Sequence, residues 1–112
     1  MNYAEILTNV MRDQERFQPS FVPVRIVSVC DPASRQFLLV AVGWEGWRRV
    51  DNILFHAQLI DGQVIIETDL TEEGLKPALI EAGIRAEDFL SDRDRDREER
   101  ERDREQPVQL AA

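Results

Sequence analysis

Four apolar segments rich in β-branched residues follow one another between residues 24 and 69, and no segment with helical periodicity separates them. They are Val24–Asp31, Gln36–Trp44, Val50–Ile60 and Gln63–Asp69. Parallel strands need a crossover connection of a dozen or more residues, whereas the connections here have between two and five. The sequence therefore predicts a four-stranded, mainly antiparallel sheet.

An amphipathic helix is predicted before the first strand. Its apolar residues recur at the spacing of one helical face and are Tyr3, Ile6, Leu7, Val10 and Met11. Asn2 is placed to cap the N-terminus of this helix. The helix should end near Phe17, because Pro19 and Pro23 cannot continue it.

A second helix is predicted after the last strand, over Thr71–Ala82, with Gly83 as its end. Its residues Leu75, Leu79 and Ile80 are expected to face the core. Pro77 lies inside this segment and deletes a backbone hydrogen bond, so we expect a bend there. The order of the elements favours an α+β fold, with an N-terminal helix, a four-stranded sheet and a C-terminal helix, in which the helices lie on one face of the sheet.

The Asp61-Gly62 pair is the strongest hairpin signal in the chain, and a two-residue turn sets the register of the strands on either side. This register places His56 opposite Glu67. One face of the hairpin is then apolar and is predicted to be core: Ile53, Phe55, Ala57, Leu59, Val64 and Ile66. The other face is mixed: Leu54, His56, Gln58, Ile65 and Glu67.

The net charge of −8 is spread over two parts of the chain. Residues 91–112 hold 8 acidic and 6 basic residues, and residues 91–105 include no apolar one, so this part is predicted to be a charged, solvated C-terminal tail. Residues 1–90 are predicted to form a single domain with a net charge of −6. Because a surface of that charge repels a phosphate backbone, we expect no direct nucleic-acid binding.

The residue types argue against several other classes of protein. The longest apolar run, Phe37–Val42, is far shorter than the roughly 20 residues that span a bilayer. A single cysteine, Cys30, and a single histidine provide neither a disulfide nor a metal site of several soft ligands, so no cofactor is expected. The N-terminus lacks the features of a secretion signal, and we expect a cytoplasmic protein.

Two tryptophans and two arginines surround the predicted turn between the second and third strands: Trp44, Trp47, Arg48 and Arg49. Trp and Arg are enriched at the energetic centres of protein–protein interfaces. Trp44 is expected to fill the core. Trp47 is open to two interpretations, either an interface residue or a cap on the edge of the sheet.

His56 and Glu67 form the one acid–base pair that the hairpin register predicts. A carboxylate beside an imidazole could hold one tautomer and produce a general base, as in a small hydrolase. The same two residues would also form an ordinary polar pair on a half-covered sheet face. Because the sequence places no nucleophile or second acid nearby, the polar pair is preferred.

The stretch from Val42 to Asp88 resembles the XisI-like family, whose members are known as fdxN element excision controlling factors. The residues that carry the resemblance are, in order, Val42-Gly43-Trp44, Arg49-Val50, Leu54-Phe55-His56, Ile60-Asp61-Gly62, Val64-Ile65-Ile66, Thr71-Glu72-Glu73-Gly74 and Ala82-Gly83-Ile84. The resemblance implies a small cytoplasmic α+β protein that acts with a partner called XisH, so that a site-specific recombinase excises a DNA element. It implies no catalytic residue.

The expected function is therefore that of a non-catalytic accessory factor, with an XisH-like protein and a site-specific recombinase as partners. Two alternatives remain open. One is a small hydrolase-type enzyme that uses His56 and Glu67, and the other is a protein-binding module redeployed in a different pathway.

Self-association as a homodimer is a further expectation, because the segment Gln36–Trp44 is apolar on both faces. Two short helices can cover one face of a four-stranded sheet but not both. The uncovered face would be an apolar patch too large for a monomer, and a symmetric dimer would bury it. The predicted interface residues on this face are Leu54, His56, Ile65 and Glu67.

Overall fold

The computed structural model describes residues 2–90, 97, 100 and 101. Its elements are α1 (Tyr3–Gln14), β1 (Val24–Asp31), β2 (Gln36–Glu45), β3 (Arg48–Ile60), β4 (Gln63–Asp69), α2 (Lys76–Glu81) and a 3₁₀ turn, η1 (Ala86–Asp88). The predicted solvated tail lies outside the described residues, except that positions 97, 100 and 101 are helical and exposed.

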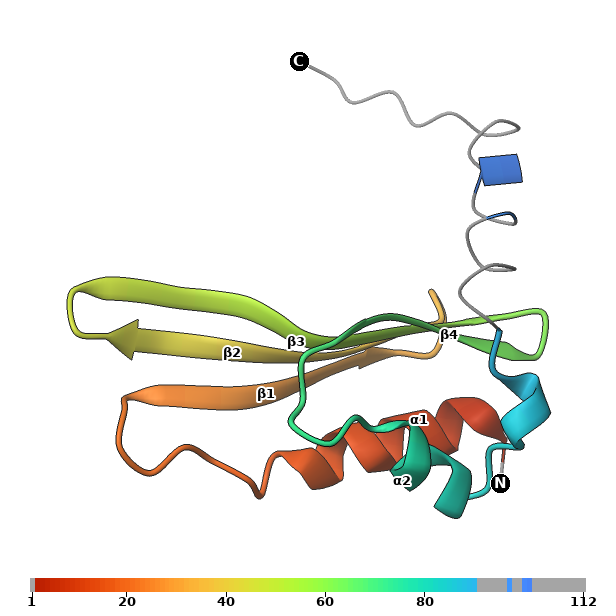
Figure 1. The fold of residues 1–112 in the computed structure, drawn as a ribbon, viewed down its shortest axis with the longest axis horizontal. Coiled ribbons are helices and arrows are strands. Elements are labelled where there is room, and N and C mark those ends of the chain that lie inside the picture. The colour runs from red at the N-terminus through yellow and green to blue at the C-terminus, as the bar shows by residue number, and fades with distance from the viewer. Residues whose placement is uncertain (1, 91–96, 98–99, 102–112) are drawn as a thin grey trace.

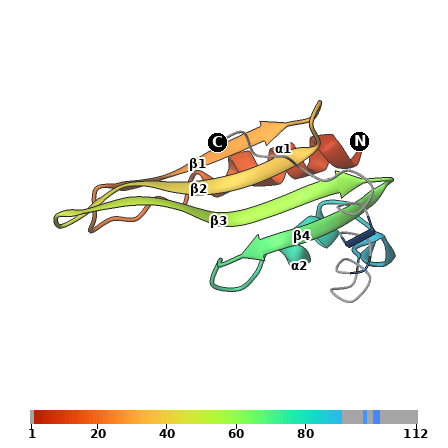
Figure 2. The same ribbon diagram turned by 90° about the horizontal axis from the view of Figure 1, so that it is seen from above.

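The four strands form one sheet in the order β1-β2-β3-β4, and each neighbouring pair is antiparallel. Helices α1 and α2 lie on the same face of this sheet (Figure 1), and the view from above shows the strands side by side in chain order (Figure 2). The predicted α+β fold class is thereby confirmed. The sheet face that carries neither α1 nor α2 is called the open face below.

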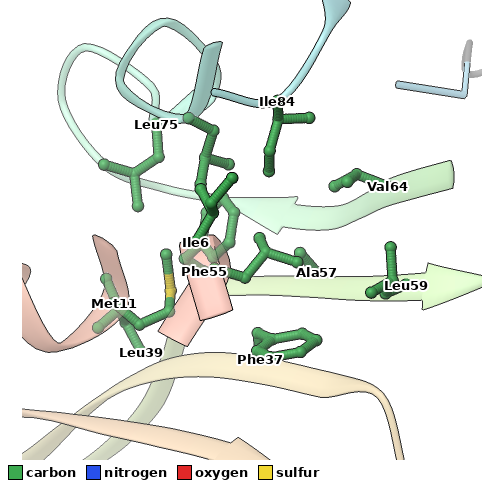
Figure 3. Close-up of a cluster of buried hydrophobic side chains, with 12 residues drawn as sticks. Ile6, Met11, Phe37, Leu39, Phe55, Ala57, Leu59, Val64, Leu75 and Ile84 are labelled. Carbon is green, nitrogen blue, oxygen red and sulfur yellow. The ribbon is translucent and has the colours of Figure 1, made fainter. Parts of the chain in front are cut away.

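The core lies between α1, α2 and the helix-covered face of the sheet (Figure 3). Phe37, Leu39 and Ala41 alternate along β2 on this face and are buried. Ile6, Leu7 and Met11 of α1 pack against them, as the helical spacing predicts. Asn2 caps α1, since its side chain accepts a hydrogen bond from the backbone nitrogen of Glu5 at 2.8 Å.

A bulge in β3 changes which residues face the core. Leu39 pairs with Phe55 and Val40 pairs with Ile53, which leaves Leu54 as the extra residue. An extra residue reverses the alternation of side chains on one side of the bulge. Ile53 therefore points to the open face with Val40 and is 44% exposed. The prediction that Ile53 belongs to the core was wrong for this reason.

A second bulge separates His56 from Glu67. The predicted register holds from the Asp61-Gly62 turn as far as the pair of Ala57 with Ile66, and then His56 pairs with Thr68. Glu67 is the extra residue at this point, so the predicted pairing of His56 with Glu67 was wrong.

The segment before α2 differs from its prediction, because α2 begins at Lys76 and not at Thr71. Pro77 lies in the first turn of this helix, where its missing N–H costs no hydrogen bond, so the helix begins there and no bend is needed. The Asp69 carboxylate accepts hydrogen bonds from the backbone nitrogens of Thr71 at 3.0 Å and Leu75 at 2.8 Å. Ile80 is exposed, contrary to prediction, whereas Leu75 and Leu79 are buried as expected.

Asp69→Ala is expected to lower the free energy of unfolding by about 1–3 kcal/mol, because two backbone N–H groups in a partly buried loop lose their acceptor. Asp69→Asn keeps one acceptor oxygen and should lose less. Urea unfolding of the native chain and both variants measures the effect. Equal transition midpoints for the native chain and Asp69→Ala would show that the carboxylate does not hold this loop.

The two edge strands of the sheet are each met by another part of the chain. The Gln18 side chain donates to the carbonyl of Ile26 at 3.1 Å and accepts from the nitrogen of Ile26 at 2.8 Å, on edge strand β1. On the other edge, Phe89 forms a parallel bridge with Val64, and the Leu90 nitrogen donates to the Val64 carbonyl at 3.0 Å. The backbone groups of Ile26 and Val64 are therefore already hydrogen-bonded at these edges.

Candidate protein-binding surfaces

The open face carries a continuous set of apolar side chains over the first three strands. Strand alternation and the pairing register place them together: Val27, Val29, Leu38, Val40, Val42 and Ile53. All six are exposed or half-buried in the isolated chain. Contiguous exposed apolar patches are typical of protein-binding surfaces, which makes the open face a candidate.

A chain of hydrogen bonds crosses the open face beside this patch. His56 Nε2 lies 2.6 Å from Gln36 Oε1, Gln36 Nε2 donates to Gln58 Oε1 at 3.0 Å, and Gln58 Nε2 donates to Glu67 Oε1 at 3.0 Å. An amide oxygen can only accept, so Nε2 of the imidazole carries the proton. Two glutamine side chains thus stand between the imidazole of His56 and the carboxylate of Glu67.

The surroundings of His56 and of the single thiol of the chain are as follows. The described contacts of His56 include a neutral amide and no carboxylate. Cys30 packs against the core cluster, and burial raises the pKa of its thiol, which keeps it protonated near neutral pH. Within residues 2–90, 97, 100 and 101, no three His, Cys, Asp or Glu side chains gather as a metal site would require.

The turn between β2 and β3, with the neighbouring loop before β1, forms a second exposed surface, here called the hairpin end. It comprises Phe21, Trp44, Trp47, Arg48 and Arg49. The guanidinium of Arg49 lies 5.2 Å from the ring centroid of Trp44, and Arg48 forms an exposed ion pair with Glu45 at 2.9 Å. Figure 1 shows this hairpin projecting past the helices.

The two tryptophans lie differently from what their sequence context predicts. Trp44 is 48% exposed, because the alternation along β2 puts it on the open face with Val42, away from the helices, so its predicted place in the core was wrong. The side chain of Trp47 is fully exposed, which rules out the interpretation as a cap on the sheet edge. Phe21, which the sequence did not single out, is 98% exposed at the same end.

Two of the predicted interface residues are less exposed than expected. Ile65 is only 1% exposed, although its pairing with Gln58 puts it on the open-face side of β4, and half-buried Leu54, the extra residue of the β3 bulge, packs against the core cluster. Ile65 therefore offers a partner almost no surface in this conformation. The interface role of the remaining predicted residues stays a prediction: Trp44, Trp47, Arg48, Arg49, His56 and Glu67.

The fold and its two surfaces define a small α+β protein with one helix-covered sheet face and an apolar open face. The chain belongs to the XisI protein family, because the sequence model of that family matches residues 1–100. This confirms the resemblance found in the sequence. The match runs ten residues past the predicted domain boundary at residue 90.

Two solved structures from Anabaena variabilis share the fold. An XisI-like protein has a TM-score of 0.71 at 21% identity, and the alignment covers 80% of this chain and 82% of that one. The fdxN element excision controlling factor XisI has a TM-score of 0.64 at 24% identity, covering 80% and 81%. A search of curated proteins finds no match. No helix in the described part of the chain is long and apolar enough to cross a membrane.

Proposed function

We propose that this protein is a non-catalytic accessory factor that controls the excision of a DNA element by binding other proteins. Its membership of the XisI family and its structural likeness to an fdxN element excision controlling factor support this role. The partners are an XisH-type protein and, through it, a site-specific recombinase. The protein acts in the cytoplasm and contacts no nucleic acid itself, since residues 1–90 carry a net charge of −6.

The hairpin end carries the proposal. Trp47 is fully exposed and Phe21 nearly so, although burying either would be favourable. Arg49 is held over Trp44, so part of the surface is ordered before any partner arrives. Exposed aromatic side chains beside arginines have the composition of a protein-binding centre.

The hydrolase alternative has weaker support. The hypothesised base pairs the imidazole of His56 with the carboxylate of Glu67, whereas Gln36 and Gln58 separate these two groups. The thiol of Cys30 is turned into the core. A protein-binding module redeployed in another pathway is compatible with the same surfaces and differs in its partner alone.

Self-association belongs to the proposal as well. The protein works as a homodimer, because the open face carries six neighbouring apolar side chains that a second copy would cover. Two sets of residues then serve two partners: the open face, with Trp44 at its end, serves a second copy, and the exposed Trp47 and Phe21 of the hairpin end serve the XisH-type protein.

The XisH-type protein from the same genome, mixed with the purified full chain, tests the proposal. Native chain is expected to bind it, and Trp47→Ala is expected to weaken binding about 30-fold, as for the truncation of an interface centre. His56→Asn retains an N–H donor and should change neither partner binding nor excision in cells. Titration calorimetry measures the affinity, and a reporter of element excision measures the activity.

Two results would overturn the proposal. Unchanged affinity in Trp47→Ala would remove the hairpin end as the binding site. Loss of excision in His56→Asn with full binding of the XisH-type protein would favour the enzyme instead.

A further inference from the structure

We infer that the open face binds the open face of a second copy around a two-fold axis along β2, so that Arg25 of each copy lies against the partner's Asp51. The inference rests on the proposed homodimer and assigns its interface. Three observations support it. Apolar side chains form rows across the open face, one of these rows carries opposite charges, and backbone groups at both sheet edges are already hydrogen-bonded.

The centre of the open face is an apolar row that crosses three strands. Pairing register puts Val27 of β1 beside Val40 of β2, and Val40 beside Ile53 of β3. The bulge at Leu54 creates this row, because without it Ile53 would point to the helices. A two-fold axis along β2 exchanges β1 with β3. It places Val27 against the partner's Ile53 and Val40 against the partner's Val40, so the row is complementary to itself.

The next row towards the hairpin end holds opposite charges on either side of β2. Arg25 of β1 pairs with Val42, and Val42 pairs with Asp51 of β3. Both charged residues are exposed, and neither forms an ion pair within the described residues. The axis along β2 brings Arg25 of each copy over the partner's Asp51, which creates two equivalent ion pairs. Opposite charges matched across an interface fix its register and orientation.

The other in-plane axis, across the strands, does not match these charges. This axis places each strand over the same strand of the partner, with the two strands running in opposite directions. If the axis passes through Val40, Arg25 lies over the partner's Val29. A charged side chain would then be buried against an apolar one without a partner, which is costly. The charges therefore select the axis along β2.

The open face approaches the size that a stable dimer needs. A ten-residue strand rises about 3.3 Å per residue and neighbouring strands are about 4.8 Å apart, so the three strands β1, β2 and β3 present on the order of 480 Å² per copy, without counting the relief of their side chains. Two copies together bury about 950 Å² on this count, close to the roughly 1,000 Å² that marks a specific interface. Sheets that pack face to face align their strands within about 30°, as this axis requires.

Association by sheet extension is less favourable than face-to-face packing. Gln18 occupies the backbone groups of Ile26 on the β1 edge, and Leu90 occupies the carbonyl of Val64 on the β4 edge. A second copy that paired with either edge would first have to break these hydrogen bonds.

Light scattering of the full chain at micromolar concentration tests the inference. The native chain should have twice the 13.0 kDa of one copy. Arg25→Glu and Asp51→Arg should each raise the dimer dissociation constant at least about tenfold, because like charges then face each other twice. The double variant Arg25→Glu/Asp51→Arg should restore the native value. Arg16→Glu, a charge change of the same kind at an exposed position just after α1 on the helix-covered side, should leave it unchanged.

Val40→Asp tests the apolar row and should give a mass of 13.0 kDa, with native circular dichroism as the check on folding. The exposed positions of Arg25 and Asp51 keep the test valid if Val40→Asp does not fold. A native mass of 13.0 kDa would overturn the inference. So would single charge variants that weaken the dimer while the double variant fails to restore it. A monomeric Val40→Asp that still binds the XisH-type protein leaves the proposed function intact, so the two failures are distinguishable.

Discussion

Phe55→Ala is expected to lower the free energy of unfolding by about 3–5 kcal/mol, which is a large part of the stability of a domain of this size. The ring of Phe55 is completely buried on the helix-covered face, in the cluster with α1 and α2 that Figure 3 shows. Its removal loses the transfer free energy of a whole ring and leaves a cavity that the paired strands cannot close.

Urea unfolding followed by circular dichroism measures the loss. Trp47→Ala removes a larger ring from a fully exposed position and serves as the control, with an expected change within about 0.5 kcal/mol. A loss below 1 kcal/mol in Phe55→Ala would contradict the packing of the core around β3.

Gly43→Ala is expected to destabilise the chain by about 3 kcal/mol, because backbone occupies the space that the added methyl group needs. A Cβ at position 43 would lie 2.0 Å from the carbonyl oxygen of Pro23 and 2.7 Å from the Cα of Val24. Relief requires β1 to move away from β2, which breaks the pair of Val24 with Gly43 and the hydrogen bond from Trp44 nitrogen to Pro23 at 3.0 Å.

Gly46→Ala is the matched control, since Gly46 lies in the left-handed region at φ +63° and an added Cβ would meet nothing within 4 Å. It should cost about 1 kcal/mol for the backbone conformation alone. The free energies of unfolding distinguish the two variants. Faster hydrogen exchange at the Trp44 amide in Gly43→Ala would show that its hydrogen bond to the Pro23 carbonyl is the one weakened. If the two variants are equally stable, the close approach of β1 to Gly43 does not constrain the fold.

Much of the fold could be predicted because its signals are local. The strands β1 and β4 have the predicted bounds, since β-branched runs and turn residues mark their ends. The two bulges could not be predicted. An extra residue in a strand has no compositional signature, yet it turned Ile53 from the core to the open face and separated His56 from Glu67.

The candidate surfaces were predicted in part for the same reason. The tryptophans and arginines of the hairpin end are adjacent in the sequence, so their cluster could be recognised there. Arg25 and Asp51 are 26 positions apart and meet on one face through pairing across three strands, which only the register reveals. The contact of Gln36 with His56, and that of Gln58 with Gln36, depend on the same register.

Gln18 has a consequence for the size of any assembly. Its amide group, bonded to both backbone groups of Ile26, imitates one residue of a neighbouring strand and ends the hydrogen-bond ladder of the sheet. An edge strand whose backbone groups are already bonded at its middle is a poorer template for open-ended growth. Contact through a two-fold symmetric face is closed once two copies meet. As the protein concentration is raised, the fraction of dimer should therefore increase until all copies are dimeric, and no fibres or higher oligomers should form.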